Sequence, residues 1–275
     1  MSIQNAAWQP LGQPYPTTLA DARGQLHHAV QLLASFGQAL AAHQEDDSHR
    51  SMVWDVDAAA FRSAPSAADP TVTALVSPAT LEVHLARGDD SESLALTGKT
   101  LEEAYAWLGE SVGETLERPE YEIPPQAVGA GAIFDPNPNA MAELARWYGN
   151  AHGVLTEVTQ ANAEASPIRC WPHHFDLATL ITLPLAEGEK TPRSVGVGMS
   201  PGDGSYPAPY GYVTPWPYLW EEPRPELSAG QWHVDQWLGA VLTAGDWTSD
   251  DDSAAAVVSG FFAEAVRAAR GILQA

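Results

Sequence analysis

The stretch TVTALVSPATLEVHLARGDDSESLAL, residues 71–96, decides the fold class of this chain. It contains three short strand-like runs, at 71–76, 80–86 and 93–96, and turn-forming residues separate each run from the next. In the first run Val72, Ala74 and Val76 recur at every second position, which is the period of a half-buried strand. Short runs joined by short turns indicate an antiparallel meander.

Helices are expected on both sides of this meander. Before it, apolar residues recur at helical spacing from Leu19 to Leu40, and a polar loop then leads to a further strand candidate at 52–56. After it, Thr100 and Glu103 form the capping-box pattern of a helix whose apolar stripe continues to Leu116. The first half of the chain is therefore predicted to run helix, strands, helix.

A second series of helix, strands and helix follows a proline-rich connection at 118–138. Asn137 can cap a helix that reaches about Ala165. Three strand candidates and a last helix come next, at 169–183, 194–199, 210–214 and 251–273.

We therefore predict an α+β fold with two similar halves packed into one unit, residues 1–125 and residues 126–275, the second carrying the candidate site. The similar order of elements indicates an internal duplication. Two unrelated α+β segments are the alternative.

The charge of the chain excludes several classes of partner. It has 13 Lys and Arg against 35 Asp and Glu, a formal net charge of −22. Such a chain repels phosphate backbones and anionic lipids at long range, so we expect neither nucleic-acid nor membrane binding. The single cysteine, Cys170, excludes an internal disulfide framework. No apolar run has the length of a signal-peptide core or a membrane span, so we expect a cytoplasmic protein.

The most unusual stretch is CWPHHFDLA, residues 170–178, at the start of the strand candidate 169–183. Strand alternation puts His174 and Asp176 on one face and His173 on the other. A carboxylate can fix the tautomer of a neighbouring imidazole, so His174 and Asp176 are predicted to be the catalytic or recognition pair. The alternative is a strand start whose polar groups only satisfy one another's hydrogen bonds.

The same pair also fits a metal site. Together with the distant His233, His174 and Asp176 would form the 2-His-1-carboxylate set that binds Fe(II) or a similar ion. This alternative requires a divalent metal cofactor such as Fe, Mn or Zn. The His-x-Asp…His order resembles that of 2-oxoglutarate-dependent oxygenases, which implies an arginine soon after the last histidine, whereas the next arginine here is Arg267.

The second informative stretch, residues 206–220, is dense in aromatic residues and prolines. Aromatic rings on a stiff segment can line a ligand site, because they contribute contact area and lose little rotamer entropy on binding. The predicted ligand-binding residues are Trp171, His173, Tyr210, Tyr212 and Trp216. The alternative is that the rings form a satellite core beneath an irregular segment.

Residues 171–178 and 210–217 resemble an uncharacterised bacterial domain-of-unknown-function family, which has a Trp…Phe-Asp-Leu-Ala strand followed by a Tyr-x-Tyr-x-x-Pro segment. The resemblance implies a shared fold and puts Phe175 and Asp176 at a family position.

Our leading hypothesis is an intracellular small-molecule-binding protein or enzyme with an aromatic-lined pocket centred on His174 and Asp176. The metal-dependent enzyme is the first alternative. The second is an acidic module that docks a partner protein through exposed aromatic rings.

Overall fold

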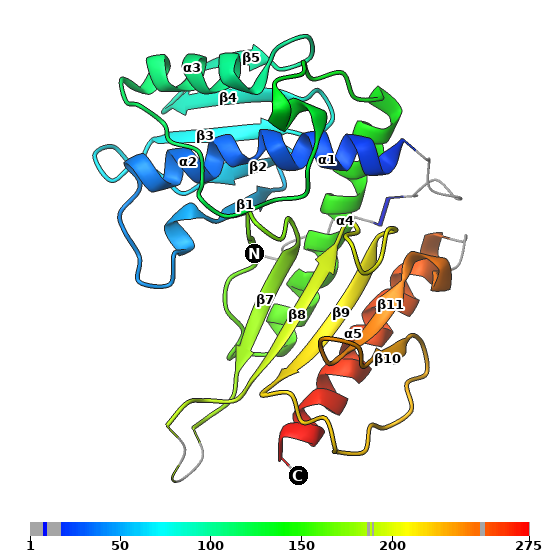
Figure 1. Cartoon of the computed structure of the whole chain (residues 1–275). Coiled ribbons are helices and arrows are strands. Elements are labelled where there is room, and N and C mark those ends of the chain that lie inside the picture. The colour runs from blue at the N-terminus through cyan, green and yellow to red at the C-terminus, as the bar shows by residue number, and fades with distance from the viewer. Residues whose placement is uncertain (1–7, 10–17, 186–187, 189, 248–250, 275) are drawn as a thin grey trace. The chain divides into compact units, whose positions relative to one another are not determined.

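The computed structural model describes residues 8–9, 18–185, 188, 190–247 and 251–274. These residues form two compact units, each with an antiparallel sheet and helices (Figure 1). We call them the N-terminal unit, which comprises the described residues of 11–149 and 169–175, and the C-terminal unit, which comprises residues 8–9, 150–168 and the described residues of 176–275. The α+β class predicted from the sequence is confirmed, whereas the internal duplication stays a prediction.

The sheet of the N-terminal unit is the predicted meander, with neighbouring strands in the order β6-β1-β2-β3-β4-β5 and every pair antiparallel. The strands are β1 (Met52–Asp55), β2 (Ala60–Ser63), β3 (Val72–Ser77), β4 (Glu82–Arg87), β5 (Asp90–Ala95) and β6 (Arg169–Cys170). The sequence did not predict β2, because four residues are too few for an alternating pattern to be recognised.

Helices accompany this sheet, with α2 packed on β2 and β3, and α3 packed on β4. The helices are α1 (Leu19–Ala29), α2 (Gln31–Leu40), α3 (Leu101–Val112) and the first part of α4 (Pro138–Ala161), together with the short 3-10 helices η1 (Ser48–Arg50) and η2 (Ala127–Ala130).

Local capping explains where these helices begin and end. The capping box of Thr100 and Glu103 is present at the start of α3, and the Asn137 carboxamide accepts the amides of Asn139 and Ala140 at the start of α4. The expected extension of α3 to Leu116 is wrong, because Gly113 has a φ of 75° and ends the helix in the left-handed conformation.

The predicted helix 19–40 is in fact two helices that meet at Val30. The amide of Leu33 bonds to the Val30 carbonyl at 3.0 Å, three residues back, and this tighter turn marks the boundary between α1 and α2.

The sheet of the C-terminal unit has the strand order β10-β11-β9-β8-β7, again antiparallel throughout. Its elements are β7 (Leu177–Thr182), β8 (Ser194–Ser200), β9 (Tyr210–Trp216), β10 (Gln231–His233), β11 (Gly239–Thr243), η3 (Ala244–Asp246) and α5 (Asp251–Gln274), with the remainder of α4. The short strands β10 and β11 were not predicted.

Helix α5 covers one face of this sheet and packs on β8, β9 and β11 (Figure 1). Phe262 of α5 lies so close to Gly211 that a β-carbon there would be 2.8 Å from the ring. Because side chains alternate along a strand, Tyr210 and Tyr212 project from the opposite face, which we call the tyrosine face.

Among the residues described, no helix combines the length and the apolar character needed to cross a bilayer.

Candidate functional site

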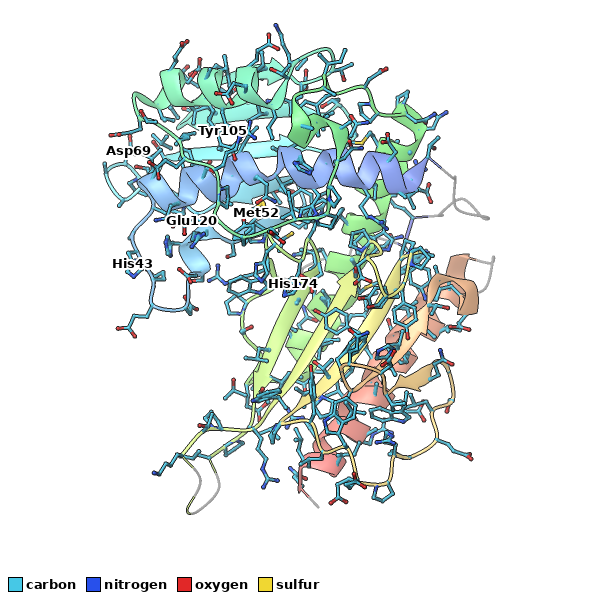
Figure 2. The ribbon with its side chains drawn as sticks, in the orientation of Figure 1. His43, Met52, Asp69, Tyr105, Glu120 and His174 are labelled. Carbon is cyan, nitrogen blue, oxygen red and sulfur yellow. The ribbon has the colours of Figure 1, made fainter. Side chains whose placement is uncertain are left out.

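A tight turn interrupts the CWPHHFDLA stretch after Cys170 and before Leu177, so the stretch is not one continuous strand, and Figure 2 labels His174 within the turn. The Trp171 carbonyl accepts the amide of His174 at 3.1 Å and that of Phe175 at 2.7 Å. Phe175 has a φ of 61°, a left-handed value that a bulky residue rarely adopts. The strand alternation predicted to put His174 and Asp176 on one face is therefore wrong, because the chain is not extended through this turn. We call residues 171–175 the histidine turn.

Buried His27 of α1 holds the histidine turn from inside the N-terminal unit. Its ring stacks on that of Phe175, with centroids 4.7 Å apart, and its Nε2 lies 2.8 Å from the Pro172 carbonyl oxygen. A carbonyl can only accept, so Nε2 carries the proton of the neutral imidazole. Burial lowers the pKa of His27 from 6.5 to about 4, and the ring is therefore neutral at pH 7.

Other polar side chains complete this support. Gln31 donates to the Pro172 carbonyl at 2.8 Å, and the Tyr148 hydroxyl donates to the Phe175 carbonyl at 2.8 Å. The Tyr121 hydroxyl in turn donates to the Gln31 carboxamide at 2.7 Å. Interactions from three separate parts of the chain thus fix a backbone conformation that is unfavourable by itself.

The histidine turn brings together three of the predicted residues, Trp171, His173 and His174. The ring centroids of His173 and His174 are 4.1 Å apart, and those of Trp171 and His173 are 6.4 Å apart. Both histidines are exposed. Partial burial, followed by the neighbouring His174, lowers the pKa of His173. The boundary between the two compact units falls after Phe175, so Asp176 is described with the C-terminal unit.

Asp176 immediately precedes β7, and Tyr212 of β9 reaches it across β8. Tyr212 pairs with Gly198 in the sheet register, and a β-carbon on Gly198 would be 2.4 Å from the Tyr212 ring. The glycine therefore allows the ring to lie across β8, and the phenol donates its proton to the Asp176 carboxylate. Burial, followed by the charge of Asp176, raises the pKa of Tyr212 well above its usual value, so it is a neutral donor.

A second phenol–carboxylate pair lies beside the first. The Tyr210 hydroxyl donates to Asp203 at 2.5 Å. The other oxygen of Asp203 accepts the amides of Ser205 at 2.8 Å and Tyr206 at 3.0 Å, which fixes the carboxylate in the loop after β8. Burial and then the hydrogen bond to Asp203 raise the pKa of Tyr210.

Tyr206 and His233 form a third pair, whose hydroxyl oxygen and Nδ1 are 2.8 Å apart. Trp237 stacks on the His233 ring, with centroids 4.1 Å apart and an interplanar angle of 24°. The rings of Tyr206 and Tyr210 are 4.9 Å apart, and those of Tyr210 and Tyr212 are 6.1 Å apart. We call the whole group the tyrosine network; its members are Asp176, Asp203, Tyr206, Tyr210, Tyr212, His233 and Trp237.

The tyrosine network contains Asp176, Tyr210, Tyr212 and His233 of the predicted site residues. Trp216, in contrast, lies at the far end of β9, is 53% exposed and packs edge-on against Tyr218 at 5.2 Å.

Sequence reasoning missed Asp203, Tyr206 and Trp237 as members of the network. Tyr206 was noted only as one ring of the aromatic stretch 206–220. Asp203 belongs to the glycine-rich run 200–204, which by itself indicates only a turn. Trp237 was one of several tryptophans after the aromatic stretch, and no local pattern distinguishes it from the others.

The predicted metal ligands His174, Asp176 and His233 gain no support. Within the described ranges, no group of three or more His, Cys, Asp or Glu side chains is arranged to hold a metal ion. Both ring nitrogens of His233 have hydrogen-bond partners, the Tyr206 hydroxyl and the Asp235 carbonyl. The metal-dependent enzyme therefore stays an alternative hypothesis.

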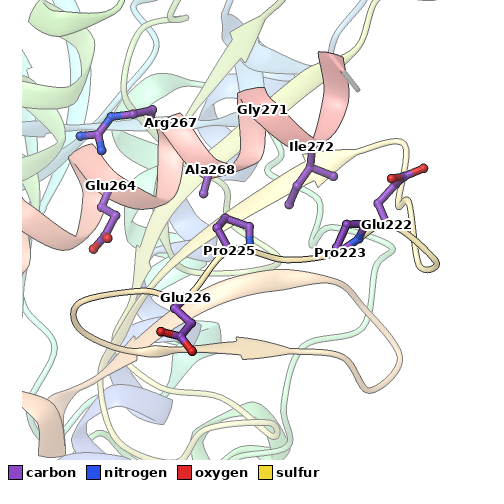
Figure 3. A pocket seen from close by; sticks show the side chains of 9 residues that line it. All are labelled: Glu222, Pro223, Pro225, Glu226, Glu264, Arg267, Ala268, Gly271 and Ile272. Atoms are coloured by element: carbon purple, nitrogen blue, oxygen red, sulfur yellow. The ribbon is translucent and has the colours of Figure 1, made fainter.

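A cavity of about 370 Å³ lies elsewhere in the C-terminal unit, between α5 and the segment that follows β9 (Figure 3). It is lined by Glu222, Pro223, Pro225, Glu226, Glu264, Arg267, Ala268, Gly271 and Ile272. None of the predicted site residues is among them. Glu264 is already bound by the Ser228 amide at 2.9 Å and the Ser228 hydroxyl at 3.1 Å. The lining offers no imidazole, phenol or thiol, so the tyrosine network is the better candidate site.

Comparison of the chain with family models, with curated proteins and with solved structures finds no match. Any functional assignment therefore rests on the geometry described above.

Proposed function

We propose that this chain binds a small organic molecule at the tyrosine network, as a binding protein or as an enzyme. The observation that carries the proposal is the row of three phenols whose hydroxyl groups are each bonded to a fixed partner: Tyr206 to His233, Tyr210 to Asp203 and Tyr212 to Asp176. A site with aromatic walls and a few oriented polar groups is what small-molecule recognition requires.

Pre-organisation supports this proposal. Hydrogen bonds and stacking hold the side chains of the network before any ligand arrives, so binding costs little additional side-chain entropy. Tyr206, His233 and Trp237 are only partly buried, which leaves part of their surface for contact with a ligand.

The Asp176–Tyr212 pair also suits proton transfer. A phenol bonded to a carboxylate can accept a proton on its oxygen while its own proton passes to the carboxylate. Binding is the step that a binding protein and an enzyme share, and it is therefore the step to test first.

The histidine turn is a second candidate for chemistry, in the N-terminal unit. What favours it is the strained Phe175 conformation, which buried partners stabilise at a point where two imidazoles are exposed. We propose that His173 and His174 act there in recognition or proton transfer.

Ligand-observed NMR with aromatic fragments on the full chain tests the proposal for the tyrosine network. The informative variant is Trp237→Ala, which removes an aromatic wall of the network, and the matched control is Glu226→Gln in the separate cavity. We expect some fragments to bind the wild type and the control but to lose about tenfold in affinity with Trp237→Ala. Binding that is the same in all three proteins, or no binding at all, would contradict the proposal.

A further inference from the structure

We propose that the C-terminal unit docks a basic segment of a partner protein on the surface formed by the cavity of Figure 3 and the aromatic rings that precede it in the chain. A lysine or arginine of that segment enters the cavity, and its apolar side chains lie on the rings. The inference goes beyond the proposed function, because it concerns a different surface and a macromolecular ligand.

Three aromatic rings at the end of β9 and on the segment that follows it are open to solvent. Trp216 is 53% exposed and Trp220 is 41% exposed, and Tyr218 between them is half-buried. The Tyr218 ring packs edge-on against both, with centroids 5.2 Å from that of Trp216 and 5.6 Å from that of Trp220. We call these three residues the aromatic ladder. Single exposed rings are common on protein surfaces, whereas a contiguous exposed group indicates a surface for a partner.

The cavity begins two residues after the ladder, at Glu222. Its apolar lining consists of Pro223, Pro225, Ala268 and Ile272. Its volume of about 370 Å³ is at the lower end of the range for small-ligand pockets, which suits one long side chain. The ladder and the cavity therefore give an extended segment two adjacent anchor points.

The polar lining of the cavity is mainly negative. It has three carboxylates, those of Glu222, Glu226 and Glu264, and one guanidinium, that of Arg267, which in Figure 3 points away from Glu222 and Glu226. Glu264 already accepts two hydrogen bonds from Ser228. Among the described residues, the carboxylates of Glu222 and Glu226 have neither a hydrogen bond nor an ion pair, so both are available to a cation.

This combination of surfaces is complementary to lysine and arginine. The methylene stem of either side chain can pack on the apolar lining while its charged end meets the carboxylates. The indole faces of the ladder can hold a further cation or an apolar side chain. The formal net charge of −22 attracts a basic partner from solution and repels an acidic one.

The docking surface is formed before a partner arrives. Prolines at 215, 217, 223 and 225 restrict the backbone that carries it. The Trp232 indole donates to the Pro225 carbonyl at 2.8 Å, and Arg224 donates to the Trp220 carbonyl at 3.2 Å. Little entropy is then lost on binding, which favours a short segment as the ligand.

Selection of short random peptides against the full chain tests the proposal without assuming a sequence. We expect the selected peptides to be enriched in lysine and arginine and to bind less tightly as the ionic strength rises. Their affinities are measured by fluorescence anisotropy. Trp220→Ala removes one ring of the ladder and Glu226→Gln removes one charge of the cavity, and each should weaken binding about tenfold.

The matched controls lie in the N-terminal unit. Glu45→Gln removes an exposed carboxylate, and Ile133→Ala shortens an apolar side chain that is 53% exposed. Both should leave the affinity unchanged. Trp237→Ala in the tyrosine network should also leave it unchanged, which separates this surface from the proposed small-molecule site. Circular dichroism of each variant verifies that it folds.

Three outcomes would overturn the proposal. The first is the selection of acidic or uncharged peptides, or of none. The second is binding that depends on Glu226 but not on Trp220, which would show a cation pocket without a docking surface. The third is an equal loss with Glu45→Gln and Glu226→Gln, which would show that only the overall charge attracts the peptides. None of these outcomes bears on fragment binding at Trp237, so the proposed function is tested separately.

Discussion

The ring of Tyr212 lies directly over the backbone of Gly198, on the strand next to its own. The two residues are register partners in β9 and β8, and a β-carbon at Gly198 would be 2.4 Å from the ring. Real β-carbons do not approach other atoms this closely, so a side chain at Gly198 and the observed position of Tyr212 exclude each other. The hydrogen bond between Tyr212 and Asp176 therefore depends on a residue that makes no polar contact with either.

Replacing Gly198 with alanine should displace the Tyr212 ring and break its bond to Asp176. We expect a loss of about 1–3 kcal/mol in the free energy of unfolding, measured by urea denaturation, and weaker fragment binding. The matched control is Gly260→Ala in α5, where nothing lies within 4 Å of the new β-carbon, and here helix propensity predicts a gain of about 0.5–1 kcal/mol. A Gly198→Ala protein with the stability and binding of the wild type would contradict the predicted displacement.

Replacing Tyr212 with phenylalanine keeps the ring and removes the proton that Asp176 accepts. Because it takes a donor from a buried carboxylate, the change should lower the free energy of unfolding by about 1–3 kcal/mol. Tyr218→Phe is the control, since no hydrogen bond of the Tyr218 hydroxyl occurs in the described part of the chain, and it should stay within about 0.5 kcal/mol of the wild type. Equal effects of the two substitutions on urea denaturation would show that the Asp176 contact adds no stability.

Alkaline pH should destabilise the protein through its tyrosines. Burial is the main cause of a raised pKa in five of the 8 tyrosines, namely Tyr105, Tyr121, Tyr206, Tyr210 and Tyr212. Unfolded phenols lose their protons near pH 10 while these folded ones keep theirs, so the stabilisation is complete below pH 10 and is lost as the pH rises further. Phenolate absorbance should therefore rise later in the native than in the urea-unfolded protein. A native titration that coincides with the unfolded one would contradict this expectation.

Acid should weaken the histidine turn through His27. Its folded pKa is about 4 against 6.5 when unfolded, so the unfolded chain binds the extra proton first and stability falls as the pH drops from 6.5 toward 4. At pH 7 the His27→Gln variant should be less stable than the wild type, and that difference should shrink by up to about 3 kcal/mol by pH 4.

Tyr148→Phe is the control for this acid effect. It removes another hydrogen bond to the histidine turn without changing a group that titrates in acid, so its difference from the wild type should stay constant with pH. Parallel pH curves for wild type and His27→Gln in urea denaturation would refute the role of His27.

Local patterns were enough to predict much of the fold. The meander of β3, β4 and β5 follows from alternation and turn residues, and the caps at Thr100 and Asn137 follow from side chains within three residues of the helix start. These features depend on residues that are close together in the sequence. Local sequence patterns can therefore predict them.

The histidine turn and the tyrosine network depend on distant partners. Residues 169–183 alternate like one strand, but contacts from His27 and Tyr148 stabilise a turn within them. The meeting of Tyr212 with Asp176 depends on the register of three strands and on the missing side chain at Gly198. Sequence reasoning named Tyr212 and Asp176 separately, and it had no means of pairing them.

The edge strand β5 bears on how copies of this chain behave at high concentration. It ends the strand order of the N-terminal unit, and its first four residues, DSES, are all exposed. An unpaired strand edge can recruit the edge of another molecule and start aggregation, and edge charges oppose this by repulsion between like strands. Asp90 places a negative charge on this edge, and Glu92 is held beside it by an ion pair with Arg87, so charged side chains discourage edge-to-edge polymerisation.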